Sequence, residues 1–258
     1  MVATTGRLRI YLTGNVTLEW GDTLVSDNLF PGRQGRLAFA LLVAERGTAI
    51  SVDGIADVLW NGRPPRSQTT ALRAIMSKLR ALVTESGLDG VVAIDNAFGC
   101  YQLRLPANAW IDLEAAAQAV HNAETELRAG NLVAANGEAL VAAAISRRTF
   151  LAGDDGEWVE QWRAKLREIR VRALSCRAEV AICNGDPVLA VGDAELVIEL
   201  EPYREAAYVL LMRAHAAAGS HAQALHAYER LRTLMSDQFG AAPSPTSQTA
   251  FVDILRRS

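Results

Sequence analysis

Three segments in the second half of the chain repeat one pattern of small residues, and this repeat limits the possible folds more than any other feature. Gly130, Gly185 and Gly219 are each followed by small or apolar residues at spacings of five, four and three. The three runs are Ala135, Ala139 and Ala142, then Ala190, Ala194 and Val197, then Ala224, Tyr228 and Leu231. Small residues at this spacing let two antiparallel helices approach closely around a tight turn.

The last two glycines of the pattern are 34 residues apart, which is the period of a tetratricopeptide helix pair. Pro202, between the last two runs, agrees with a break between helices. The first interval is longer and requires an insertion. Alanine is common enough in this chain for chance to explain the match. We nevertheless predict an array of helix pairs and expect the chain beyond Trp110 to be helical, without strands.

The chain before Pro106 follows a different pattern. Alternating β-type residues, broken by the turn signals Gly14-Asn15 and Gly21-Asp22, predict a small antiparallel sheet. Its three strands would be Arg7–Leu12, Val16–Trp20 and Thr23–Val25.

Three helices and a hairpin are predicted next. Leu37, Leu41 and Ala44 have helical spacing, and Ser51 is a suitable N-cap for a short helix over Val52–Trp60. The prolines of Asn61–Pro65 end that helix, and a third helix is expected from Arg66 to Val83. Val91–Ile94 and Tyr101–Leu103 then predict a β-hairpin with its turn at Asp95–Gly99.

The third predicted helix has an unusual charge. The chain as a whole has a net charge of −3, but between Asp57 and Glu85 it carries five basic residues and no acid. These are Arg63, Arg66, Arg73, Lys78 and Arg80. A local surface of this kind binds anions.

A helical arrangement separates an apolar face from a basic one. Leu72, Met76, Leu79 and Val83 fall on one side. Arg66, Arg73 and Arg80 are seven apart and project in nearly the same direction, flanked by Thr69, Thr70 and Ser77. Arginine binds guanine or phosphate through two bonds, and hydroxyls reach phosphates or base edges. A solvated amphipathic face is the simpler explanation, but a short capped helix, a loop, this helix and a hairpin together make a winged helix-turn-helix.

Ordered motifs along nearly the whole chain resemble a known family. The first part, with Gly35-Arg36-Leu37, Leu59-Trp60, Pro64-Pro65 and Met76–Arg80, resembles the amino-terminal domain of the Streptomyces antibiotic regulatory proteins. The later part, with Trp110–Leu113, Glu201–Glu205 and Phe239–Pro245, resembles the bacterial transcriptional activator domain that follows it. The resemblance implies an α+β OmpR-type winged-helix domain at residues 1–106 and an all-α, tetratricopeptide-like domain at residues 107–258.

The resemblance also implies a function. Members of this family are transcriptional activators that bind direct repeats in a promoter and recruit RNA polymerase, often for a secondary-metabolite (antibiotic) gene cluster. The expected DNA-binding residues are Arg66, Thr69, Thr70, Arg73, Ser77, Lys78 and Arg80. The loop with Trp60, Asn61, Gly62 and Arg63 would face the sigma factor or the flap of the polymerase holoenzyme, and two copies would occupy adjacent repeats.

Two positions depart from the family pattern. The predicted wing, with Asn96, Ala97 and Phe98, has the acid Asp95 where relatives commonly carry a basic residue, and an acid is repelled by phosphate. Arg73 stands where relatives often have glutamine, which leaves the preferred base open. An alternative function is therefore an interaction adaptor, in which a degenerate winged helix accompanies a peptide-binding helical array.

The remaining candidate residues have structural interpretations. Trp158 and Trp162 are expected to anchor packing at the start of a helix over Trp158–Cys183, and the acids Asp154, Asp155, Glu157 and Glu160 to cap and charge its first turn. Cys176 and Cys183 are expected to be buried thiols. His215, His221 and His226 lack a carboxylate at metal-binding spacing.

No catalytic motif is present. The sequence contains neither a phosphate-binding Gly-Lys-Ser/Thr loop nor a Gly-x-Ser-x-Gly or His-Glu-x-x-His motif. We therefore expect no enzymatic activity, no cofactor and no metal. No apolar run is long enough to cross a bilayer and no signal peptide is evident, so a cytoplasmic protein is expected.

Overall fold

The computed structural model describes residues 6–256 and divides into two compact units. Unit 1 extends to Ala115 and also includes Arg148–Leu166, whereas unit 2 comprises Ala116–Arg147 and the chain from Arg167 onward. Each unit is therefore built from two separate stretches of the chain. The predicted boundary between residues 106 and 107 stays a prediction. The two units are described separately.

Unit 1 begins with the predicted antiparallel sheet. Strand β1 (Arg9–Tyr11) pairs with β2 (Thr17–Trp20), and β2 pairs with β3 (Thr23–Val25). A fourth strand, β7 (Trp110–Ile111), lies parallel to β1 on its other side. The expectation of no strand beyond Trp110 is therefore wrong, because two residues that extend a sheet edge give no periodic signal of their own.

Three helices follow the sheet in the predicted order. They are α1 (Gly32–Ala44), α2 (Val52–Trp60) and α3 (Gln68–Glu85), and a short 3₁₀ turn at Asp27–Leu29 precedes α1. The Ser51 hydroxyl accepts a hydrogen bond from the amide of Gly54, which confirms the predicted cap of α2. Phe30, just before α1, packs against Phe39 of α1 with ring centroids 5.1 Å apart.

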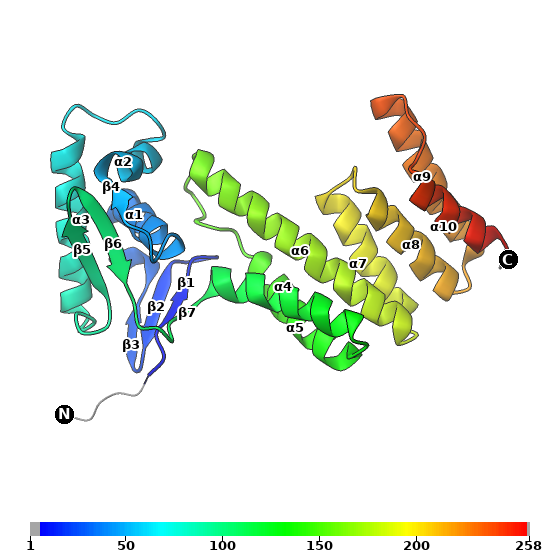
Figure 1. Ribbon diagram of the computed structural model, residues 1–258, viewed down its shortest axis with the longest axis horizontal. Helices are drawn as coiled ribbons and strands as arrows, with labels where there is room; N and C mark the ends of the chain where they lie inside the picture. Colours follow the sequence, from blue (N-terminus) through cyan, green and yellow to red (C-terminus); the bar gives the residue numbers. More distant parts are fainter. Residues whose placement is uncertain (1–5, 257–258) are drawn as a thin grey trace. The chain divides into compact units, whose positions relative to one another are not determined.

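The wing of unit 1 is a three-stranded sheet. Strand β6 (Cys100–Arg104) lies between β4 (Ile50–Ser51) and β5 (Ala93–Ala97), and β5 packs beside α3 (Figure 1). The hairpin is confirmed, but its turn is shorter than predicted. Only Phe98 and Gly99 connect the strands, because Asp95 and Asn96 are paired within the ladder.

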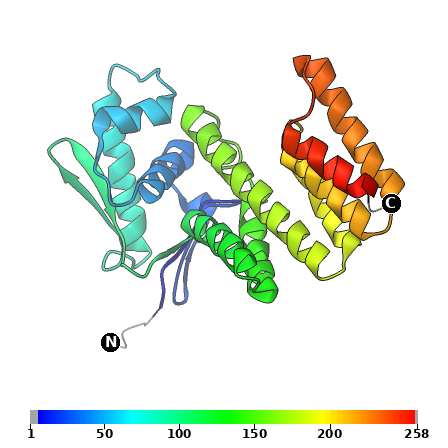
Figure 2. The same cartoon turned by 45° about the vertical axis from the view of Figure 1, so that its right-hand side comes forward.

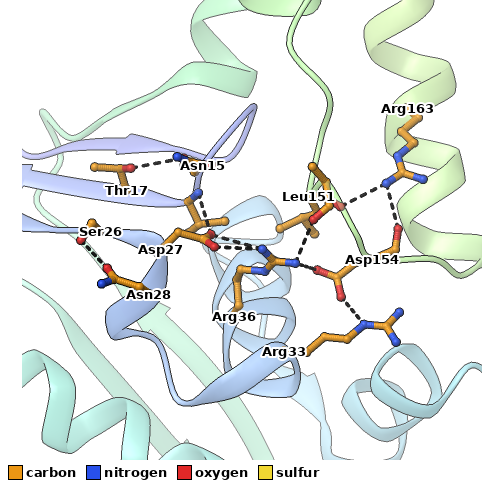
Figure 3. A network of polar contacts seen from close by, with 12 residues as sticks. Asn15, Thr17, Ser26, Asp27, Asn28, Arg33, Arg36, Leu151, Asp154 and Arg163 are labelled. Carbon is orange, nitrogen blue, oxygen red and sulfur yellow. Dashed lines mark hydrogen bonds and ion pairs between the residues drawn. The ribbon is translucent and has the colours of Figure 1, made fainter.

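A network of ion pairs fixes the segment Arg148–Leu166 within unit 1. The buried carboxylate of Asp154 accepts hydrogen bonds from Arg33 and Arg36, each at 2.5 Å, and Arg36 also binds Asp27 (Figure 3). Arg163 donates to the carbonyl oxygens of Phe150, Leu151 and Asp154. Asp154 therefore binds α1 across more than a hundred residues rather than capping the helix after it, which corrects the expectation for this acid.

A second buried carboxylate, Asp112, joins the end of this unit to its sheet. One of its oxygens accepts hydrogen bonds from the amides of Leu12 and Thr13 and from the Thr13 hydroxyl, at 2.7–2.9 Å. Burial raises the pKa of Asp112, and the donors from Thr13 and Leu12 act in the opposite direction. Beside it, the amide of Gly14 donates to the carbonyl oxygen of Thr149, which holds the beginning of the inserted segment against the turn after β1.

Unit 2 is entirely helical within the part of the chain that the structure describes. Two of its helices, α4 (Asp112–Arg128) and α6 (Glu157–Cys183), begin in unit 1. The others are α5 (Leu132–Ser146), α7 (Pro187–Leu200), α8 (Glu205–Ala217), α9 (His221–Phe239) and α10 (Pro245–Arg256). Figure 2 shows α7, α8 and α9 lying side by side in sequence order.

The predicted repeat is confirmed by burial. All nine residues of the three small-residue runs are buried, on α5, α7 and α9, and eight of them are completely enclosed. Ion pairs reproduce the same period, because Glu168 with Arg204, Glu179 with Arg213 and Glu195 with Arg230 are separated by 34–36 residues. These pairs therefore join the second repeat, α6 and α7, to the third repeat, α8 and α9.

Several smaller expectations can now be compared with the structure. Phe150 packs against both predicted anchors, with centroids 5.5 Å from Trp158 and 5.9 Å from Trp162. Cys176 is buried, and burial raises its pKa to about 11, but Cys183 is exposed because it is the last residue of α6. In residues 6–256 the structure shows neither a cluster of potential metal ligands nor a helix long and apolar enough to span a membrane.

Candidate nucleic-acid interface

Helix α3 has one buried face and one exposed face, as its sequence predicts. The buried residues are Leu72, Ile75, Met76, Leu79 and Val83. They pack α3 against α1 and α2. Every residue of the predicted DNA-binding set is exposed, so the helix presents its polar side away from the core of unit 1.

The helix begins two residues later than expected. Its first residue is Gln68, and Arg66 lies in the turn before it. The Gln68 side chain donates to Asp53 of α2, at 2.9 Å, which fixes the start of the helix. The arginine row predicted from a continuous helix therefore loses its first member, because Pro64 and Pro65 shift helix nucleation downstream.

The centre of the exposed face carries an unneutralised positive charge. Arg73 has Thr69 and Thr70 one turn before it and Ser77 one turn after it, and Lys78 follows. Within the described residues 6–256, the side chains of Arg73 and Lys78 make neither a hydrogen bond nor an ion pair. Two cations among hydroxyls, with no carboxylate in reach, form a surface that attracts anions.

Arg80 has a different environment from Arg73. Its Nε and Nη2 atoms donate to the carbonyl oxygen of Ile94 in β5, at 2.9 and 2.8 Å. The guanidinium also lies over the ring of Tyr101, 5.8 Å from its centre. Arg80 therefore ties the wing to α3, and only part of its charge faces solvent.

The loop after α2 has a rigid beginning. Trp60 is half-buried, while Asn61, Gly62 and Arg63 are exposed. Asn61 ends α2 in the left-handed conformation, at a φ of 49°, and the amide of Gly62 bonds to Asp57. Arg63 has no ion-pair partner in the described part of the chain.

This loop also borders the start of α6 within unit 1. The Asn61 side-chain oxygen lies 3.5 Å from the amide of Glu157, which donates to it. Between them is an open pocket of about 340 Å³, whose lining includes Asp57, Asp155 and Trp158. No local sequence pattern predicts this contact, because the two residues are 96 positions apart.

The acid of the wing, Asp95, is paired with a base, whereas the sequence predicted an acidic wing. Asp95 pairs with Arg104 across the hairpin, with Nε and Oδ2 2.5 Å apart. Asn96, Ala97 and Phe98 are exposed, and Phe98 is 104% exposed. The end of the hairpin is therefore uncharged rather than acidic.

Comparison with known proteins extends this picture. A family model described as the bacterial transcriptional activator domain matches residues 111–255. The chain is 29% identical over 224 residues to the transcriptional regulatory protein EmbR of Mycobacterium tuberculosis, covering 86% of this chain and 57% of that protein. It is 30% identical over 253 residues to the regulatory protein AfsR of Streptomyces coelicolor, covering 97% of this chain and 24% of AfsR.

A shorter relative is matched over most of its length. The chain is 26% identical over 234 residues to the regulatory protein DnrI of Streptomyces peucetius, which covers 87% of this chain and 84% of DnrI. Among solved structures, Mycobacterium tuberculosis EmbR in complex with a low affinity phosphopeptide has a TM-score of 0.84 at 27% identity, covering 98% of this chain and 66% of EmbR. The chain thus spans little more than half of EmbR and about a quarter of AfsR.

Proposed function

Since the chain belongs to the bacterial transcriptional activator domain family, within the Streptomyces antibiotic regulatory protein type, we propose that it is a sequence-specific DNA-binding activator of transcription. One observation carries the proposal. The exposed face of α3 holds Arg73 and Lys78 among hydroxyls, and neither side chain has an ion-pair partner among the described residues. A winged helix with such a face binds double-stranded DNA through the major groove.

The residues divide into contacts of different kinds. Arg73 is the central contact, to a guanine edge or to phosphate, with Thr69, Thr70 and Ser77 as shorter contacts and Lys78 as a phosphate contact. Arg66 approaches the DNA backbone from the turn before the helix. Arg80 holds the wing and offers its remaining N–H groups to phosphate.

The partners follow from the same proposal. Promoter DNA with direct repeats would bind two copies, and the exposed loop at Asn61–Arg63 would contact the sigma factor or the flap of RNA polymerase. Activation of a secondary-metabolite (antibiotic) gene cluster is the biological role that we propose. The adaptor alternative is not favoured, because the acidic wing that suggested it is paired with Arg104.

A gel-shift series with DNA from upstream of the chain's own gene neighbourhood tests the proposal. The wild-type chain is expected to bind one fragment preferentially, and footprinting then gives the repeat spacing. Arg73→Ala should weaken binding by about tenfold and lower the salt dependence by about one phosphate contact. Arg147→Ala, which removes an exposed arginine from the end of α5, is the charge-matched control and should bind normally. Binding without sequence preference, unchanged by Arg73→Ala, would refute the assignment of α3.

A further inference from the structure

A pocket in unit 2 is lined by the same repeat position on three successive helices. Ile182 of α6, Ala216 of α8 and Ala250 of α10 follow one another at intervals of 34 residues, which is the period of the predicted repeat. The other lining residues are Arg213, Ala217, His221, Asp253 and Ile254. Because stacked repeats place equivalent positions next to one another, the pocket is a product of the array itself.

The pocket is large enough for a small organic molecule. Its volume is about 600 Å³, within the range of about 300–1,000 Å³ that is usual for small-molecule sites. Three of the lining residues are alanines, whose short side chains leave this space unfilled. Ile182 and Ile254 supply larger apolar walls, and Ile254 is only 7% exposed. Most of the lining is therefore suited to the carbon skeleton of a ligand.

Contacts away from the pocket fix α10 against α8 and α9 (Figure 2). The ring of Phe251 stacks on Tyr228 of α9, with centroids 4.0 Å apart. Near the start of α10, the Ser247 hydroxyl and the Ser244 amide donate to Glu205 of α8, at 2.6 and 2.8 Å. These contacts keep the pocket open, because α10 cannot close the space towards α6 without breaking them.

One carboxylate in the lining of the pocket is uncompensated. Arg213 is neutralised by Glu179 of α6, to which its Nη1 and Nη2 atoms both donate. In the described residues 6–256, by contrast, the side chain of Asp253 makes neither a hydrogen bond nor an ion pair. Asp253 is exposed and so lies at the edge of the pocket, while the imidazole of His221 adds a polar group. The pocket thus combines an apolar interior with a negative charge at its edge.

We propose that this pocket binds a small organic amine with an apolar body, whose ammonium group pairs with Asp253. The apolar body packs against the isoleucines and alanines of the lining. An ammonium complements the carboxylate, whereas an anionic ligand meets a like charge there. A bound amine contacts α6, α8 and α10 together and therefore stabilises unit 2. This inference goes beyond the proposed function, and its test requires no DNA.

Three compounds that share the adamantane cage test the proposal. They are 1-aminoadamantane, 1-adamantanol and 1-adamantanecarboxylate, which differ in the charge of the head group. The amine should bind with a dissociation constant of about 1 mM, as suits its size, and the other two about tenfold more weakly. NMR of the full chain with labelled isoleucine methyl groups measures and locates this binding. The signals of Ile182 and Ile254 should shift, and that of Ile145 in α5 should not.

Two variants separate the charge from the cavity. Asp253→Asn should weaken amine binding about tenfold, to the level of the alcohol. Its control is Asp237→Asn, at an exposed acid of α9 outside the lining, which should leave binding unchanged. Ala216→Phe fills the cavity and should abolish binding of all three compounds, whereas Ala218→Phe, just beyond α8, should not. Thermal unfolding checks that both phenylalanine variants are folded.

Several results would overturn the proposal. Equal affinity for the amine and the carboxylate, or amine binding that is unchanged by Asp253→Asn, would remove the role of the charge. Methyl shifts outside the pocket, with Ile182 and Ile254 unaffected, would place the ligand elsewhere. Absence of binding at about 10 mM amine, where a site with the expected constant is about 90% occupied, would refute the site itself.

Discussion

Arginine has opposite surroundings in the α3 region and in the helical array. From Arg167 onward, seven arginines of the described chain form ion pairs in unit 2. Six of these pairs join different helices and one lies within α9. Between Asp57 and Glu85, by contrast, Arg63, Arg66, Arg73 and Lys78 make no ion pair in the part of the chain that the structure describes.

The difference lies in where the carboxylates are. The array supplies a glutamate or aspartate within reach of most of its arginines, whereas the interval between Asp57 and Glu85 contains no acid. Removing one partner of a buried charge pair leaves the other charge uncompensated and destabilises the fold, whereas unpaired charges at the surface attract a partner. The comparison predicts that arginines of the array affect unfolding and that arginines of α3 affect DNA binding.

The largest effect is expected at the most buried pair of the array. Arg177 and Asp193 are 3.4 Å apart and their side chains are 19% and 4% exposed. Arg177→Ala leaves the carboxylate buried without a partner, which should lower the free energy of unfolding by about 3 kcal/mol. Urea titration monitored by circular dichroism measures this loss. The double variant Arg177→Ala with Asp193→Asn should recover most of it.

The same pair makes a prediction about pH. Burial raises the pKa of Asp193 above its unfolded value, and Arg177 acts against that rise. A carboxyl group whose pKa is raised by folding favours the folded state at low pH, and this contribution is lost as the pH rises through the folded pKa. The destabilisation by Arg177→Ala should therefore be greater at pH 7 than at pH 4. An equal loss at both would contradict this account of the pair.

A comparison of Arg73 and Arg80 sharpens the contrast within α3 itself. Arg73→Ala should reduce DNA affinity by about tenfold and change the free energy of unfolding by less than about 0.5 kcal/mol. Arg80→Ala removes two hydrogen bonds to Ile94 and should lower the free energy of unfolding by about 1 kcal/mol as well as weakening DNA binding. Gel shifts and urea titrations on both variants give the two readouts. If both variants changed the free energy of unfolding equally, Arg80 would have no structural role that Arg73 lacks.

A moderate effect is expected at Glu124 and Arg172, which form two hydrogen bonds of 2.7 Å between α4 and α6. The bond from Arg172 lowers the pKa of Glu124, and burial opposes it. The pair therefore stabilises the fold above the unfolded pKa of Glu124, and this contribution disappears as the pH falls through the folded value. Glu124→Gln should lower the free energy of unfolding by about 1 kcal/mol at pH 7. Thermal unfolding at pH 7 and pH 3 measures the difference, which should be smaller at the lower pH.

The smallest effect is expected where a paired arginine remains exposed. Arg232 and Glu229 lie three residues apart on α9, with side chains 61% and 46% exposed. Arg232→Ala should change the free energy of unfolding by less than about 0.5 kcal/mol, because solvent screens the pair. DNA affinity should not change, which makes this variant a second control for Arg73→Ala. A clear loss of DNA binding here would show that the array also contributes to the interface.

Much of the fold follows from periodicity in the sequence. The bounds of α2 and its cap at Ser51, the buried face of α3 and the nine buried repeat residues were all predicted from local spacing. These features are local because a helix or a repeat fixes side-chain direction within a few residues. The exposure of the α3 set was predicted on the same basis.

Other features of the site are not encoded locally. The pairing of Asp95 with Arg104 depends on the register of the hairpin, and the role of Arg80 depends on where β5 lies beside α3. The binding of Asp154 to Arg33 and Arg36 joins segments about 120 residues apart. From its position shortly before α6, Asp154 was predicted to cap that helix. In the structure it is instead buried in an ion-pair network with Arg33 and Arg36.

By itself, the sequence determined that a basic, acid-free helix face would stand beside a hairpin and precede a repeated helical array. Helical spacing and charge composition are properties of neighbouring residues, so the sequence is sufficient for them. Only the tertiary structure decided which cations remain unpaired, because a charge is neutralised by whatever the fold brings within a few ångströms of it. The tertiary structure also decided that Phe98 lies fully exposed in a two-residue turn, because the length of the turn depends on the register of β5 and β6.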